Sequence, residues 1–367
     1  MEVIDAFRDE PLLDAGDSLV EYVQQLCECL KRWDPVSNTK GNEKREFVEA
    51  LTEIAALPLD SISMEVRRLL VDGGDGDGGN EEDGLNSSPI SSDSNIAPIV
   101  RIIAALSCRD VLLKCKAANA LGSICISRVA GQRLLDVHGD AVLKSLMRMA
   151  TCRNKWAQGD AFFVLGWVVV IADEAMLKQV ARLVPAVIRF LHRSVAPEDA
   201  NNGSRKDHRN HAAAPSSSSS SSTEEASNFR IYALVLLLNF VQRDVSVFAS
   251  ADTQQLLMNA MHAIVQKLNV QVIPTENGES GDANNCFEMS EFVELLRLSV
   301  TFTSLLVDQV DAVAPLVLEM KLLPALLKLH QVLMRVHEAG LLGGDEQEAT
   351  DLSERMAAIV ETVVACR

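Results

Sequence analysis

The chain has 367 residues, of which 48% are apolar and only 4% aromatic, so a core must be built mainly from aliphatic side chains. Its formal net charge of −17 disfavours binding to nucleic acid or to an anionic membrane, because phosphates would be repelled. The longest apolar run, residues 161–172, is shorter than the roughly 20 residues that a bilayer span needs. We therefore expect protein partners, with the acidic balance favouring basic ones on encounter.

Eight cysteines are spread along the chain, several of them inside apolar helical patterns. The opening residues MEVIDAFRDE are acidic and do not resemble a secretory signal. Reduced thiols are the simplest account of this usage, which predicts a cytoplasmic or, alternatively, a nuclear protein. We expect a monomer rather than an oligomer.

Residues 1–71 carry amphipathic helical patterns that would pack on, or extend, the rest of the molecule. Ser18 and Glu21 have the spacing of a capping box, which predicts that the first helix begins at Leu19. The Asp34-Pro35 step predicts its end. The helices expected here span 19–33, 43–57 and 64–71.

Residues 72–96 are Gly-rich and acidic, then Ser-rich, which predicts a solvated linker. The run DGDGGNEEDG invites comparison with a calcium-binding EF-hand loop, whose sixth and twelfth positions are Gly and Glu. Counted from Asp75, those positions hold Asn80 and Asn86. The solvated linker is therefore the better interpretation.

A nearly continuous helical pattern covers residues 97–338, interrupted by two polar stretches that we predict to be disordered insertions, 197–227 and 274–286. A closing helix over 346–367 has charges on one side and apolar residues on the other, as the terminal cap of a repeat array has. The helices expected between 97 and 338 span 99–106, 111–127, 139–150, 157–172, 229–243, 253–268, 289–307 and 322–337.

An internal repeat links three of these helices. The Leu121-Gly122 step of KAANALGSI recurs 44 residues later as Leu165-Gly166 in GDAFFVLGW. Leu237 of IYALVLLLNF takes the same position, about 41 residues further on once the insertion is removed. The segments LVPAVIRFL and LLPALLKLH also share a Pro-Ala step just inside a helix start. A period in the low forties is typical of armadillo and HEAT arrays.

These segments resemble the armadillo family, whose inner helix reads roughly Ala-Ala-Trp-Ala-Leu-Ser-Asn-Ile. The resemblance covers residues 99–336 and implies an all-α, armadillo-like right-handed α-solenoid with disordered loop insertions. It also implies that the inner helices line a concave groove, where the family's Trp and Asn positions face the ligand. The Trp positions here hold Asn119, Phe163 and Val235. The Asn positions hold Ser123, Trp167 and Asn239, and in the poorly aligned fourth unit Ser299 and Thr303 are the nearest equivalents.

Only Asn239 keeps the family residue, so this groove departs from the type that clamps an extended basic peptide. An apolar groove centred on Phe163, Trp167 and Val235 predicts an apolar partner segment, helical or extended. Trp167 is the expected hot spot. The alternative is that Phe163 and Trp167 are ordinary core residues.

No catalytic constellation is found in the sequence, and we predict neither a metal site nor a cofactor. His330 and His337 lie seven residues apart on a helix with no acidic or Cys partner at ligand spacing. Ser221 and Ser222 precede two glutamates and Ser88 precedes a proline, so these serines are candidate phosphorylation sites. The alternative is an unmodified spacer.

The sequence thus predicts a non-enzymatic scaffold or adaptor that holds a partner protein in the groove. The alternative is a chaperone regulator. Nucleotide-exchange factors of the seventy-kilodalton heat-shock chaperone are also short armadillo arrays with helical flanks, and they are similar to this chain in length and architecture.

Overall fold

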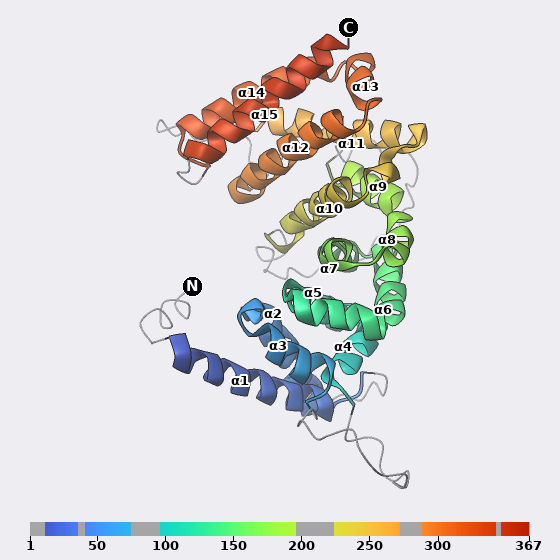
Figure 1. Ribbon diagram of the computed structural model, residues 1–367, viewed down its shortest axis with the longest axis vertical. Helices are drawn as coiled ribbons and strands as arrows, with labels where there is room; N and C mark the ends of the chain where they lie inside the picture. The colour runs from blue at the N-terminus through green and yellow to red at the C-terminus, as the bar shows by residue number, and fades with distance from the viewer. Residues whose placement is uncertain are drawn as a thin grey trace, which may run out of the picture. The chain divides into compact units, whose positions relative to one another are not determined.

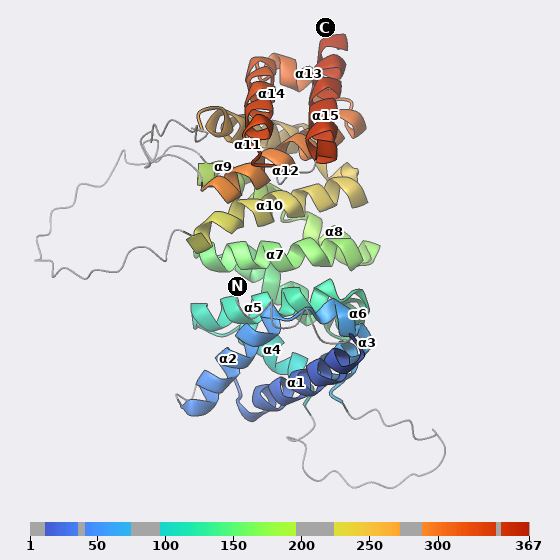
Figure 2. The same ribbon diagram turned by 90° about the vertical axis from the view of Figure 1, so that its left-hand side faces the viewer.

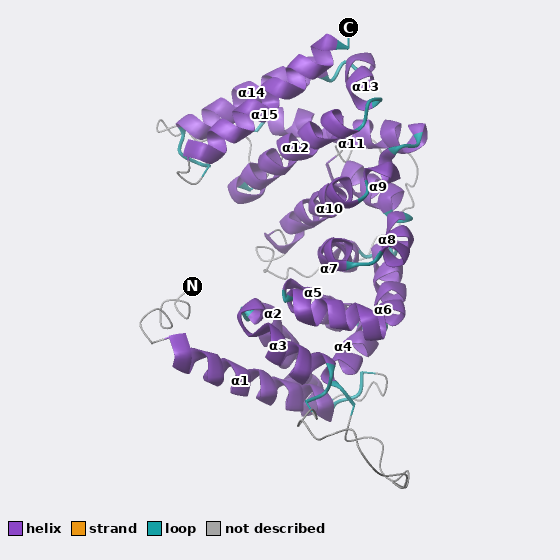
Figure 3. Cartoon of the chain, in the orientation of Figure 1, coloured by secondary structure: helices purple, strands orange, loops and turns teal. Residues whose placement is uncertain are grey.

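The structure, a computed structural model, describes residues 12–35, 41–74, 96–195, 224–271, 288–342 and 346–366. All regular secondary structure in these ranges is helical (Figure 3), which confirms the all-α prediction. The chain divides into two compact units, Met1–Val180 and Ala181–Arg367. Each unit is described by itself. Among the described residues no one helix has the length and apolarity of a membrane span, and only the bent pair Met289–Gln309 and Val313–Glu319 meets that test jointly.

The first unit contains eight α-helices and two short helices of other types within its described ranges. They are α1 (Leu12–Arg32), α2 (Asn42–Ala56), η2 (Leu59–Ile62), α3 (Ser63–Val66), η3 (Arg67–Val71), α4 (Pro98–Leu106), α5 (Val111–Ile126), α6 (Arg128–Ala150), α7 (Lys155–Ile171) and α8 (Glu174–Ala181). The helices of the second unit are α9 (Val184–Val195), α10 (Glu224–Arg243), η5 (Val245–Phe248), α11 (Ala251–Asn269), α12 (Met289–Gln309), α13 (Val313–Glu319), α14 (Leu323–Glu338) and α15 (Glu346–Ala365).

Two parallel layers of helices build the first unit. In the inner layer α5 packs between α2 and α7, and in the outer layer α4 packs between α1 and α6 (Figure 2). Each inner helix also packs against the outer helix that precedes it, as α7 does against α6. This layering follows from the sequence of α5 and α7, in which buried positions occur on most sides of the helix and need several neighbours.

The second unit repeats the same arrangement. Its inner layer is the series α10, α12 and α15, and its outer layer is the series α9, α11 and α14 (Figure 1). The short helices η5 and α13 precede the outer helices α11 and α14, as α8 precedes α9. Three helices per repeat, with the second and third stacked on those of the next repeat, make the fold an armadillo-like α-solenoid.

The 44-residue step of the sequence is also a structural step. Asp110 caps the start of α5 by accepting the N–H of Leu113 at 3.2 Å, and Asn154 caps α7 by accepting that of Ala157 at 3.0 Å. The leucines aligned in the sequence, Leu121, Leu165 and Leu237, are all fully buried in α5, α7 and α10. The register inferred from sequence therefore places equivalent residues in equivalent core positions.

The start of α6 was predicted incorrectly. The helix begins at Arg128, where the Ser127 hydroxyl accepts the N–H of Ala130 at 3.3 Å, and not at Gly139. Residues 128–139 contain two glycines, Gly131 and Gly139, which make room for neighbouring side chains. A Cβ on Gly131 would lie 2.7 Å from the Ile171 side chain, so the glycine serves close helix packing.

Three other boundaries also differ from expectation. The first helix begins at Leu12, so Ser18 lies inside α1 and the capping-box prediction is wrong, because that short pattern also fits a helix interior. The helix α10 begins at Glu224, inside the first predicted insertion. Asp72, assigned to a solvated linker, is held by Arg133 at 2.9 Å and Arg67 at 3.2 Å. The remainder of that linker, residues 75–95, lies outside the described residues.

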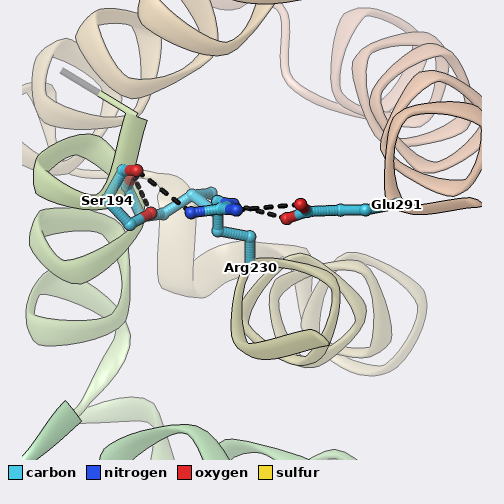
Figure 4. Close-up of polar contacts among 4 residues, drawn as sticks. Ser194, Arg230 and Glu291 are labelled. Carbon is cyan, nitrogen blue, oxygen red and sulfur yellow. Dashed lines mark hydrogen bonds and ion pairs between the residues drawn. The ribbon is translucent and has the colours of Figure 1, made fainter. Parts of the chain in front are cut away.

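A buried ion pair fixes the packing of α9, α10 and α12 in the second unit. Arg230 on α10 donates to both carboxylate oxygens of Glu291 on α12, at 2.5 and 2.8 Å, and to the carbonyl of Ser194 on α9 at 3.3 Å (Figure 4). The Glu291 side chain is only 2% exposed. Burial raises the pKa of Glu291, and the Arg230 guanidinium opposes that rise. One guanidinium therefore links three helices in a bidentate geometry.

We predict that Glu291→Gln destabilises the protein, because it leaves the largely buried Arg230 guanidinium without its counter-charge. The expected loss is about 3 kcal/mol of unfolding free energy, measured by urea denaturation followed by circular dichroism. The matched control is Glu49→Gln, which removes the solvent-exposed partner of Arg45 and should change stability by less than about 0.5 kcal/mol. Equal effects of the two substitutions would contradict the linking role of this pair.

Candidate binding face of the inner helices

Two stripes of partly exposed side chains run along α5 and α7. Six of these residues recur every seven positions, which is close to two helical turns and keeps them on one side, and Trp167 follows Phe163 by about one turn on that same side of α7. The seven-spaced residues of the two stripes are related by the 44-residue repeat, whereas the equivalent of Trp167 on α5 is Ser123. We call this surface the α5–α7 face, and it consists of Leu112, Asn119, Ile126, Trp156, Phe163, Trp167 and Val170.

Several members of the α5–α7 face are unusually open for apolar residues. Leu112 is 61% exposed and Ile126 is 40% exposed on α5, and Val170 is 38% exposed on α7. Sequence reasoning missed these three residues because it transferred only the family's Trp and Asn positions. The combination of seven-residue spacing with the 44-residue repeat could have found them.

The predicted site residues of α5 have different surroundings. Asn119 is half-buried on the face. Ser123 is only 5% exposed, and its hydroxyl donates to the carbonyl of Ala55 on α2 at 2.9 Å. This hydroxyl therefore joins α5 to α2, which is a structural role within the inner layer.

Phe163 lies directly on the backbone of the neighbouring inner helix. A Cβ built on Gly122 of α5 would come within 2.2 Å of the Phe163 ring, so the ring occupies the space that the glycine leaves. Phe163 is half-buried, and Trp167, one turn further along α7, is half-buried as well. Phe163 thus combines a packing contact with a partly exposed surface, whereas sequence reasoning had treated core and groove as alternatives.

The remaining predicted groove residues belong to the second unit. Val235 and Asn239 are half-buried on α10. Ser299 and Thr303 of α12, at 1% and 4% exposure, are buried, and the Thr303 hydroxyl donates to the Ser299 carbonyl at 2.7 Å. The two α12 residues therefore do not reach the surface. The predicted groove combines residues of both units, whereas the α5–α7 face belongs to the first unit alone.

The chemistry available on the α5–α7 face is apolar contact together with the hydrogen-bonding amide of Asn119. Within the described ranges no three His, Cys, Asp or Glu side chains gather in a way that could hold a metal ion. The Nε2 atom of His330 lies 3.1 Å from the Ser353 hydroxyl, within hydrogen-bonding distance. The candidate phosphorylation sites Ser88, Ser221 and Ser222 lie outside the described residues and stay predictions.

Comparison with known proteins gives structural neighbours only. No protein-family model and no curated protein matches the chain. A designed armadillo repeat protein is 11% identical, with a TM-score of 0.49 and 93% and 99% of the two chains covered. A second designed armadillo repeat protein, in complex with the peptide (KR)4, is 11% identical, with a TM-score of 0.48 and 92% and 99% covered. Computationally designed armadillo repeat proteins for modular peptide recognition are 12% identical, with a TM-score of 0.48, and the match covers 93% of this chain and 99% of the designed one.

We predict that Gly122→Ala destabilises the protein although alanine is the better helix former. The new methyl group would overlap the Phe163 ring, and overpacking of this kind costs about 1–3 kcal/mol before the helix-propensity gain. Thermal and urea denaturation measure the net change, which we expect to be a loss.

The matched control for this prediction is Gly139→Ala in α6. Its added Cβ would meet the terminal methyl of Met176 at 2.5 Å, and that unbranched side chain can turn away. We expect this variant to be as stable as the native protein or more stable. If Gly122→Ala behaved in the same way, Phe163 would not rest on α5.

Proposed function

We propose that this protein is a non-enzymatic scaffold or adaptor that binds a segment of a partner protein along its inner helices. The observation that carries the proposal is the position of Trp167. It lies half-buried in α7, among side chains of the α5–α7 face that stay open to solvent although they are apolar. Contiguous apolar surface of this kind marks interaction sites, and tryptophan is enriched among the residues that dominate binding energy.

The proposed ligand is an apolar segment, either helical or extended. The stripe from Leu112 to Ile126 spans four turns of α5, or about 21 Å, and the stripe on α7 is of similar length. An amphipathic helix of four turns could place its apolar face along this length, and an extended strand of about six residues would span the same distance. Phe163 and Trp167 would then form the centre of the contact.

The side chains of the α5–α7 face supply contact area rather than proton transfer, which supports a binding role over a catalytic one. The chaperone-regulator alternative stays a prediction, and no feature of this face favours it. A monomeric state and a cytoplasmic or nuclear location are part of the same proposal.

The experiment is a quantitative affinity capture from cell extract, read by mass spectrometry, with the native protein and Trp167→Ala compared side by side. We expect the specific partners to be depleted about tenfold or more by the substitution, since truncation of a central aromatic anchor costs about 2 kcal/mol or more. Direct titration of the identified partner segment should give the same ratio.

Met334→Ala is the matched control, because Met334 is a large apolar residue that is 40% exposed but lies on α14, in the outer layer. It should leave capture unchanged. Both variants must keep the native circular dichroism spectrum and melting temperature. If Trp167→Ala captured the same partners in the same amounts, the α5–α7 face would not be the binding site.

A further inference from the structure

The turns that lead into α5 and α7 are two copies of one motif. Residues 107–110 read Ser-Cys-Arg-Asp and residues 151–154 read Thr-Cys-Arg-Asn. In each copy the last residue caps the following helix, and the cysteine thiol donates to the carbonyl of that residue, at 3.3 Å in the first and 3.4 Å in the second. The middle residues, Arg109 and Arg153, are both exposed. The motif therefore presents one arginine per repeat at the beginning of an inner helix.

Side-chain contacts place these two turns at the same edge of the first unit. The Cys115 thiol of α5 donates to the Asp160 carboxylate of α7, so the second turns of both helices are neighbours. Burial is the main reason that the pKa of Cys115 is raised, and the Asp160 charge raises it further. The Cys115 side chain therefore stays a protonated thiol that can donate to the Asp160 carboxylate. On the outer side, the hydroxyls of Ser107 and Ser145 are 3.0 Å apart, which fixes the first motif against α6.

Cations gather at this edge, in contrast to the chain as a whole with its net charge of −17. Arg109, Arg153 and Lys155 are exposed, and Lys114 and Lys116 are half-buried. In the part of the chain that the structure describes, none of them forms a salt bridge. We call this surface the basic edge, and it consists of Arg109, Lys114, Lys116, Arg153 and Lys155.

Two acidic groups at the basic edge, Asp110 and Asp160, are already engaged. Asp110 accepts Lys44 of α2 at 2.7 Å as well as the capping N–H, and these bonds lower its pKa. Asp160 is only 7% exposed and accepts the Cys115 thiol. The beginnings of α5 and α7 add the positive ends of two helix dipoles. The local field therefore favours negative charge.

Two exposed aliphatic residues stand among these cations in the sequence of α5. Leu112, at 61%, is among the most exposed apolar residues of the described chain, and Val111 beside it is 38% exposed. An aliphatic side chain favours an apolar residue of a protein over a nucleotide base, which stacks on flat rings. The strongly acidic remainder of the molecule would also repel a nucleic-acid backbone.

We propose that the basic edge binds an acidic protein segment, rich in Asp and Glu, that places one apolar side chain on Leu112. This rests on the proposed function and adds the charge of one part of the partner, namely the part that crosses the first turns of α5 and α7 beyond the apolar part on the α5–α7 face. Arg109 and Arg153 can each hold a carboxylate with two parallel hydrogen bonds. The lysines would attract the segment without fixing its geometry.

The test uses a fluorescein-labelled peptide of about eight residues, made of Glu and Asp with one central Leu. This length spans two helices that pack about 10 Å apart, at about 3.3 Å per extended residue. Fluorescence anisotropy with the full chain gives Kd. Three further probes are the same peptide with Gly in place of Leu, a Lys-rich peptide with the central Leu, and an oligodeoxythymidine of equal charge.

We expect the acidic peptide with Leu to bind most tightly and to weaken with added salt. The double variant Arg109→Glu/Arg153→Glu should raise its Kd about tenfold or more, and Leu112→Ser should raise it several-fold. The matched control is Arg128→Glu, an exposed arginine at the start of α6 and beyond the far end of α5, which should stay within about twofold of the native Kd. The double variant Lys114→Glu/Lys116→Glu tests two other cations of the basic edge and should also raise the Kd for the acidic peptide.

The inference is overturned if the Lys-rich peptide or the oligonucleotide binds as tightly as the acidic peptide, or if Arg109→Glu/Arg153→Glu leaves its Kd unchanged. These outcomes are separable from failure of the proposed function. If Trp167→Ala loses partner capture while the charge-reversed variant keeps the native Kd for the acidic peptide, only the proposal for the basic edge is wrong. Conversely, if Arg109→Glu/Arg153→Glu weakens peptide binding and Trp167→Ala leaves partner capture unchanged, the basic edge is the binding site and the α5–α7 face is not.

Discussion

The inner helices of this protein have apolar residues on most of their surface, and this constraint determines the rest of the structure. Eleven of the seventeen residues of α7 are buried. A helix of this kind cannot be covered by one partner, and α7 accordingly packs against α5 on one side and α6 on another. Stacking of similar helices is the arrangement that satisfies each of them, and it leaves a stripe of each inner helix open.

Close contact between the inner helices is what sets the form of the open stripe. Gly122 allows the Phe163 ring to lie on α5, and the Ser123 hydroxyl ties α5 to the end of α2. These contacts hold the side chains of the α5–α7 face on rigid elements. A preorganised surface loses little conformational entropy when a partner binds, which suits a scaffold whose task is recognition. The two roles of Phe163, packing and exposure, are therefore compatible.

The charge of one surface in this protein can differ in sign from the net charge of the chain. The net charge of −17 suggested basic partners, yet the starts of α5 and α7 carry five cations without salt bridges among the described residues. Screening limits the influence of exposed charges to about 8 Å in physiological salt, so the local field at an edge follows its own residues. In the second unit, by contrast, Glu291 and Arg230 neutralise each other inside the protein. A whole-chain charge balance therefore predicts solubility better than the sign of one surface.

The sequence by itself determined the all-α class, the 44-residue step and the buried leucines at Leu121 and Leu165, because these depend on local periodicity that every repeat restates. It also pointed to Phe163 and Trp167. Only the tertiary structure decided that Ser123 and Ser299 are buried, and that Leu112 is open. The physical reason is that a helix position is covered or exposed according to which neighbours pack beside it. Those neighbours come from distant parts of the chain, so the local pattern around a residue does not contain that information.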